Sequence, residues 1–239
     1  RAQSTPAIDE GLRQYMMSVY NYMASGLALT GLVAYMLFQA TAVTGPTGDI
    51  VGLTSLGVTL YTGPMMWVVA LAPLGIVMYM SFGIRNMSAS RAQTMFWIFA
   101  FLMGLSLSTI FITYTGASIA RVFFITASTF GAMSIYGYTT KRDLTGFGSF
   151  LFMGLIGIII ASIVNIFMQS PALYYGISIL GVLIFVGLTA YDTQKIKNMY
   201  MAYDSAEVAA KKAIMGALTL YLDFINLFIM LLRLFGQRR

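Results

Sequence analysis

The sequence contains no cysteine and no histidine among its 239 residues. Without cysteine the chain has no disulfide, no thiolate metal site and no cysteine nucleophile. Without histidine it lacks the most common general base and the most common transition-metal ligand of proteins. Most enzyme chemistry is therefore excluded, including serine-protease chemistry with a histidine base, and we expect no catalytic activity and no resident cofactor.

Charged residues are also scarce, at 9% of the chain, whereas 59% of the residues are hydrophobic. A soluble domain carries about 25% charged residues, so the composition predicts an integral membrane protein. A helix needs about 20 apolar residues to cross the hydrocarbon core of a bilayer. Seven stretches meet this condition, and the polar segments between them are short. We expect an all-α fold with a single transmembrane domain over residues 1–239, its helices at roughly 20–43, 62–84, 92–114, 122–140, 145–168, 172–192 and 213–232.

The loop charges indicate an orientation. Cytoplasmic loops of membrane proteins carry an excess of Lys and Arg. Alternate loops place ten basic residues on one side, and this side is predicted to be cytoplasmic together with the N-terminus: Arg1, Arg13, Arg85, Arg91, Lys141, Arg142, Lys195, Lys197, Lys211 and Lys212. The other side receives Arg121, Arg233, Arg238 and Arg239. The basic C-terminus leaves two alternatives for the seventh segment, full crossing or re-entry, of which we favour full crossing.

The seventh stretch, residues 213–232, contains one charged residue, Asp223. A carboxylate at the bilayer centre costs roughly 2.5–3.5 kcal/mol on insertion scales. Asp223 lies 11 residues beyond Lys212, roughly 16 Å along a helix and therefore near the midplane. Asn226 follows three residues later, on the same helix face. An ionisable residue such as Asp223 inside a membrane helix indicates a functional site.

A second aspartate, Asp192, lies at the cytoplasmic end of the sixth stretch. Taken alone, it is typical of a solvated charge at a helix end. Tilting or bending of the helices would bring Asp192 and Asp223 together, and two adjacent carboxylates then share one proton. Such a pair suits a pH sensor, a Ca²⁺ site with oxygen ligands, or the activation of water as in aspartyl proteases.

Three motifs resemble signatures of the Bax inhibitor-1-like family, the transmembrane Bax inhibitor motif proteins. They are ALTLYLDFINLF at 217–228 with LLRLFG at 231–236, AYDTQKI at 190–196, and YTTKRD at 138–143. The resemblance covers all seven segments and favours a bacterial member. It implies six helices arranged as two triplets around a central seventh.

The resemblance also implies a pH-sensitive Ca²⁺ leak whose sensor is the aspartate pair, Asp192 and Asp223. Both are then candidate Ca²⁺ ligands, with Asn226 as a further cation contact. The family has an arginine at the inner end of the second helix that holds the aspartate pair in its closed state. This arginine corresponds to Arg85. Some members carry a carboxylate in the second helix, whereas residues 62–84 contain none. This departure puts the contribution of that carboxylate to ion passage in doubt.

Other functions remain open at the level of sequence. One is a regulatory membrane protein that binds a membrane protease or a stress or cell-death partner without transport. Another is a proton-coupled transporter. A remote one is an intramembrane aspartyl protease, for which Tyr191-Asp192 fits but Leu220 to Asp223 lacks the required glycines. The net charge of +6 is spread over short loops and predicts contact with membrane lipids and not with nucleic acid. A bacterial inner membrane is the favoured location, and an organellar membrane is the alternative.

Overall fold

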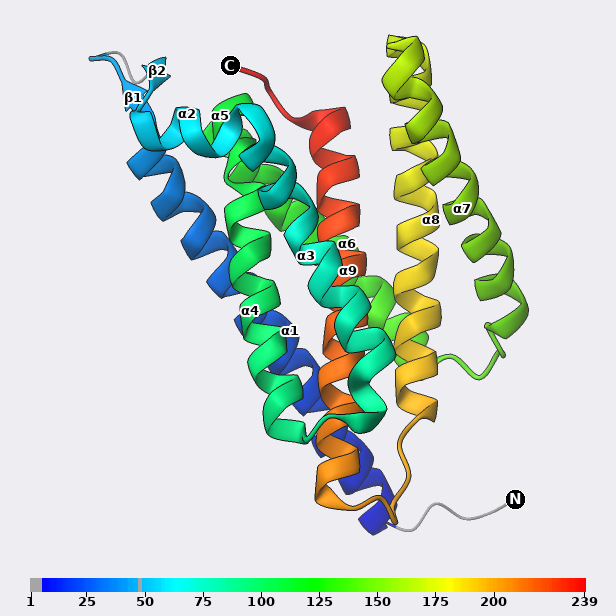
Figure 1. The fold of residues 1–239 in the computed structure, drawn as a ribbon. Helices are drawn as coiled ribbons and strands as arrows, with labels where there is room; N and C mark the ends of the chain where they lie inside the picture. The colour runs from blue at the N-terminus through cyan, green and yellow to red at the C-terminus, as the bar shows by residue number, and fades with distance from the viewer. Residues whose placement is uncertain (1–5, 47–48) are drawn as a thin grey trace. The chain divides into compact units, whose positions relative to one another are not determined.

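The fold was analysed in a computed structural model, which describes residues 6–46 and 49–239. Over these residues the chain is predominantly helical, and seven helices are long and apolar enough to cross a membrane (Figure 1). The predicted all-α membrane class and the number of spans are confirmed. Arg1, one of the ten residues in the charge count, lies outside the described residues. The long helices are α1 (Pro6–Thr41), α3 (Gly63–Gly83), α4 (Ala89–Leu107), α6 (Gly116–Thr139), α7 (Thr145–Met168), α8 (Pro171–Asn198) and α9 (Ala206–Phe235).

Several helices extend beyond the apolar stretches of the sequence. Helix α1 begins at Pro6, before its apolar stretch, α8 continues past residue 192 to Asn198, and α9 begins at Ala206, before the apolar stretch at 213–232. Hydropathy shows which part of a helix suits the hydrocarbon, whereas capping groups determine where the helix begins. Ser170 accepts a hydrogen bond from the Leu173 N–H at the start of α8.

Short elements occupy the connections between long helices. Between α1 and α3, strands β1 (Ala42–Thr44) and β2 (Ile50–Leu53) form an antiparallel pair, followed by α2 (Ser55–Tyr61). A 3₁₀ turn, η1 (Ile84–Asn86), follows α3, and α5 (Thr109–Thr113) follows α4. Sequence analysis predicted only short polar connections where β1, β2 and η1 lie, because strands of three or four residues are too short to show a period. Helix α5 lies inside the stretch 92–114, which was predicted to be one helix.

The chain divides into two compact units. The first comprises the described residues of Arg1–Gly116 with Met201–Leu218 and Arg238–Arg239, and the second comprises Ala117–Tyr200 with Thr219–Gln237. Each unit contains three of the long helices α1 to α8, and the continuous helix α9 contributes residues to both. The two triplets around a central helix stay a prediction, as does the single transmembrane domain.

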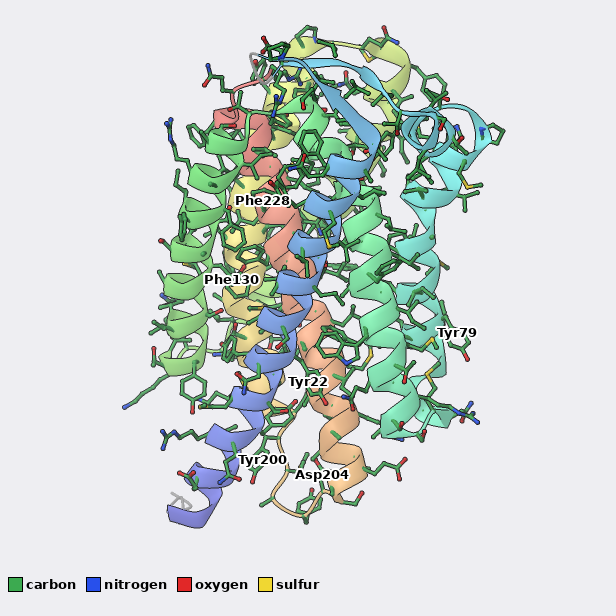
Figure 2. The ribbon with its side chains drawn as sticks, turned by 90° about the vertical axis from the view of Figure 1, so that its left-hand side faces the viewer. Tyr22, Tyr79, Phe130, Tyr200, Asp204 and Phe228 are labelled. Carbon is green, nitrogen blue, oxygen red and sulfur yellow. The ribbon has the colours of Figure 1, made fainter. Side chains whose placement is uncertain are left out.

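In the first unit, α4 packs against both α1 and α3. Gly104 of α4 allows the close approach to α1, since a Cβ at this position would lie 2.9 Å from the Thr30 carbonyl oxygen. The buried Thr30 hydroxyl donates a hydrogen bond of 2.7 Å to the Ala100 carbonyl oxygen. Tyr22, visible in Figure 2, contacts Phe96 edge to face, with ring centroids 5.9 Å apart. A glycine, a buried hydroxyl and an aromatic contact therefore join α1 to α4.

In the second unit, α8 packs against α7 along its length (Figure 1). The backbone of α6 approaches α8 so closely at Gly137 that a Cβ there would clash with the Ala190 carbonyl group. The second half of α9 contacts α6 through aromatic rings. Phe130 of α6 and Phe224 of α9 have centroids 5.5 Å apart, and Phe228 belongs to the same cluster (Figure 2). These contacts fix the positions of α8 and α9 within the unit.

Candidate functional site

A pocket of about 850 Å³ lies in the second unit between α7, α8 and the second half of α9. Its walls are mainly apolar, as is typical of pockets in proteins. Its charged lining residues are Asp192, Lys195 and Asp223. The other residues are Gly148, Ser149, Phe152, Leu155, Ile158, Ile159, Ser162, Ile163, Ile166, Phe185, Leu188, Tyr191, Thr219, Leu222, Asn226 and Met230.

Asp192 lies inside α8 and not at its end. The helix continues to Asn198, and the Asp192 residue is only 8% exposed. Gln194 helps to hold this part of α8 in place, because its side chain accepts a hydrogen bond from the Leu144 N–H and donates one to the Arg142 carbonyl oxygen, both at 2.8 Å. The interpretation of Asp192 as a solvated helix-end charge is therefore wrong.

Asp223 is buried in the middle of α9 and is 6% exposed. Of the seven candidate spans, α9 has the largest buried share. The Asp223 Oδ2 atom has no hydrogen-bond partner among the described residues. A buried polar atom without a partner carries a desolvation cost. Asp223 is thus suited to bind a group that the protein itself does not supply.

The structure brings the two predicted aspartates together. Both line the pocket, and their carboxyl groups interact with each other. A hydrogen bond between two carboxyl groups needs a proton on one of them, because an ionised carboxylate is an acceptor only. The arrangement can therefore hold one proton between the two residues, or exchange that proton for a cation.

Asn226 also lines the pocket, one helical turn beyond Asp223. Its amide nitrogen donates a hydrogen bond of 2.8 Å to the Leu222 carbonyl oxygen, so its amide oxygen is the atom suited to contact a cation. Over the described part of the chain, no group of three or more acidic, histidine or cysteine residues is arranged to hold a metal ion. Because Ca²⁺ takes six to eight oxygen ligands, an ion at the pair would need water for most of its coordination.

Arg85, the predicted closing residue, lies in η1 after α3 and is exposed. It belongs to the first unit, whereas the aspartate pair belongs to the second. Its predicted contact with the pair stays a prediction. The described helix α3 carries no carboxylate, as the sequence already showed.

Sequence analysis counted Lys195 only among the loop charges. In the structure it is part of the pocket, and it interacts electrostatically with both carboxyl groups. A signal for this was available, because Lys195 follows Asp192 by three residues and such residues share one face of a helix. It was missed because the sixth helix was expected to end at residue 192.

Comparison with known proteins finds a family model and bacterial relatives that match nearly the whole chain. A family model described as "Inhibitor of apoptosis-promoting Bax1" matches residues 12–239. An uncharacterised protein of Rickettsia prowazekii (strain Madrid E) is 50% identical over 97% of this chain and 92% of its own length. The inner membrane protein YbhL of Escherichia coli (strain K12) is 49% identical over 96% of this chain and 94% of its own length. An uncharacterised membrane protein of Streptococcus pyogenes serotype M3 (strain MGAS315) is 36% identical over 96% of this chain and 95% of its own length.

Proposed function

The chain belongs to the Bax inhibitor-1-like family, and from this membership and the buried acid pair we propose that it is a pH-sensitive Ca²⁺ leak. Asp192 and Asp223 are the proposed pH sensor, and Ca²⁺ is the transported ion. No cofactor and no catalytic step are part of the proposal. The bacterial inner membrane is the proposed location, supported by the name of the relative YbhL.

The observation that carries this proposal is the burial of two interacting carboxyl groups in one pocket of a membrane protein. Two such groups cannot both ionise at low cost, because each charge is desolvated and repels the other. The pair titrates as one unit that takes up or releases a proton. Its charge therefore depends on pH, and this charge determines whether the pocket attracts a cation.

A weak Ca²⁺ site suits a leak better than a storage site. Ion conduction requires binding that is favourable enough for entry but weak enough for release. Two carboxylates and the Asn226 amide oxygen supply only part of the oxygen ligands that Ca²⁺ prefers. An ion at the pair would keep much of its water and dissociate readily.

The gating step that we propose involves Arg85. At neutral pH the ionised pair binds the Arg85 guanidinium or a cation and holds the leak closed. At lower pH an added proton reduces the charge of the pair and releases the arginine, so the leak opens. The support for Arg85 is the family resemblance and its position at the end of α3. Competition between H⁺ and Ca²⁺ at the pair limits the flux at the lowest pH.

Ca²⁺ influx into proteoliposomes tests this function. The parent protein should admit Ca²⁺ at about pH 6 and less at about pH 7.5. Arg85→Ala should increase the influx at pH 7.5 several-fold, whereas the matched variant Arg91→Ala should not. An unchanged influx in Arg85→Ala would make the arginine an interfacial anchor. A folded parent protein with no influx at any pH would contradict the leak and favour the regulatory protein that binds a membrane partner.

A further inference from the structure

Helix α1 carries a stripe of polar side chains along one face. Its members recur every three or four residues, which places them one above the other on a helix: Glu10, Gln14, Ser18, Asn21 and Ser25. The stripe is about 22 Å long at 1.5 Å per residue, and it runs from the polar beginning of α1 into the apolar stretch at 20–43. Its members are exposed apart from the half-buried Ser18, so the stripe lies on the surface of the first unit.

Two members of the stripe lie in the part of α1 that suits hydrocarbon. The Ser25 hydroxyl donates a hydrogen bond of 2.6 Å to the Asn21 carbonyl oxygen. The exposed Asn21 amide group makes no hydrogen bond to any other residue that the structure describes. An amide in apolar surroundings is costly without partners, and it has two N–H donors and one acceptor. Asn21 can therefore bind a polar group that the bilayer supplies.

A groove of about 490 Å³ follows this stripe. Helix α1 forms most of its lining, and Trp97 of α4 forms the opposite wall. The centroid of the Trp97 ring lies 6.4 Å from that of Tyr22 and 5.5 Å from that of the buried Phe96, and these contacts hold the indole in place. All lining residues belong to the first unit, and the groove shares none of them with the pocket of the acid pair.

The chemistry of the groove changes along its length. The ring contact and the hydrogen bond that join α1 to α4 advance in the same direction along both helices, so the helices run parallel. Phe96, which contacts Tyr22, lies about two turns beyond the start of α4. Glu10 and Arg13 precede Tyr22 by more than about two turns and therefore lie beyond the start of α4. The groove is thus charged at its outer end and aromatic deeper along the helices, where Tyr and Trp suit the interface of a bilayer.

The charged end of the groove contains one group of each sign. Glu10 Oε2 lies 3.6 Å from Arg13 Nη1, and the Gln14 amide donates a hydrogen bond of 3.2 Å to Glu10 Oε1. The Arg13 and Glu10 side chains are 70% and 54% exposed, and an ion pair of this kind contributes little to stability. Both groups can therefore bind the opposite charges of a ligand at low cost. A simple anion would be repelled by Glu10, whereas a zwitterion matches both groups.

We propose that this groove binds a zwitterionic phospholipid with a primary ammonium group, the headgroup chemistry of phosphatidylethanolamine. The Arg13 guanidinium binds the phosphate, because its planar fork matches phosphate oxygens. The Glu10 carboxylate accepts hydrogen bonds from the ammonium group, and the Asn21 amide donates one to an ester carbonyl oxygen deeper in the bilayer. Phosphatidylcholine carries the same charges but no ammonium N–H, so it should bind less tightly. The proposal does not depend on the Ca²⁺ leak.

Quenching of tryptophan fluorescence by brominated lipids tests the proposal in a bilayer. The chain has two tryptophans, so Trp67→Phe leaves Trp97, in the groove, as the single reporter. This parent is placed in vesicles that contain equal parts of phosphatidylethanolamine, phosphatidylcholine and phosphatidylglycerol, of which one at a time carries brominated acyl chains. Brominated phosphatidylethanolamine should quench most strongly, with an affinity about two- to fivefold above that of phosphatidylcholine, the size expected for exposed charge pairs.

Charge variants in the same background locate the site. Arg13→Ala should weaken the binding of phosphatidylethanolamine, and Glu10→Gln should make phosphatidylethanolamine and phosphatidylcholine quench alike. Arg91→Ala and Glu207→Gln are the matched controls, because they remove the same charges at exposed positions of the first unit outside the groove, and both should keep the preference of the parent.

Three results would overturn the proposal. Equal quenching by the three lipids in the parent would indicate nonselective lipid contact. Strongest quenching by phosphatidylglycerol would indicate a site for an anion and not for a zwitterion. A preference for phosphatidylethanolamine that survives both Arg13→Ala and Glu10→Gln, or that is lost equally in the two controls, would show that the groove does not recognise the headgroup.

Discussion

At the scale of single residues, three aspartates of the second unit illustrate how surroundings decide the behaviour of one functional group. Asp192 and Asp223 are buried in an apolar pocket and interact with each other. Asp143, in the connection before α7, is exposed and accepts hydrogen bonds from the Thr145 N–H at 2.9 Å and the Thr145 hydroxyl at 2.6 Å. These two donors hold the pKa of Asp143 below its usual value.

This difference predicts that Asp143 does not contribute to pH sensing. Because its pKa is lowered in the folded protein, its hydrogen bonds stabilise the fold above the unfolded pKa of about 3.9 and are lost only as the pH falls below that value. Between about pH 5 and pH 8 it stays ionised. Asp143→Asn should therefore leave the pH dependence of Ca²⁺ influx unchanged. A clear displacement of the profile in this variant would show that the loop, and not the buried pair, senses pH.

At the scale of elements, hydropathy predicted which helices exist but not where they end. The number of spans follows from the thickness of the hydrocarbon core, which any apolar run of about 20 residues can cross. The ends depend on polar contacts. Ser205 accepts a hydrogen bond from the Val208 N–H at the start of α9, and Asp204, labelled in Figure 2, forms a 2.6 Å ion pair with Lys212 in its first turns. A cap residue such as Ser205 can be recognised in a sequence, whereas the ion pair between Asp204 and Lys212 requires knowledge of the folded chain.

The helix ends also provide positions for testing the predicted orientation. The chain has no cysteine, so single cysteines can be labelled without background. Ser90→Cys and Tyr203→Cys, both at exposed positions, should react only with reagent that reaches the cytoplasmic side. Met168→Cys, at the end of α7, should react from the outer side. Labelling of Ser90→Cys or Tyr203→Cys from outside intact cells would reverse the orientation.

The same experiment distinguishes crossing from re-entry of the last span. Helix α9 is one uninterrupted helix of 30 residues, or about 45 Å at 1.5 Å per residue, which is long enough to cross a bilayer fully. Gln237→Cys, at the exposed C-terminal end, should therefore be labelled from the outer side. Cytoplasmic labelling at this position would show that the chain returns.

At the scale of the whole molecule, the sequence predicted the identity of the acid pair but not its environment. Asp223 could be recognised as a candidate site residue from the sequence, because a carboxylate in an apolar run is costly and rare. Its proximity to Asp192 depends on the register between α8 and α9, which is set by packing such as Gly137 against Ala190 and Phe130 against Phe224. Hydropathy contains no information on that register. The positions of the two aspartates in the sequence allowed their proximity, and the resemblance to known proteins favoured it.

The central claim is that the Asp192–Asp223 pair makes Ca²⁺ passage depend on pH. The most direct measurement is Ca²⁺ influx into proteoliposomes from about pH 5 to pH 8, with the parent protein and with Asn at both positions. The parent should show influx that rises as the pH falls from 8, because protonation of the pair opens the leak. The double variant keeps the size of both side chains but binds no proton, so its influx should not change with pH over this range. A double variant that retains the pH profile of the parent would contradict the account.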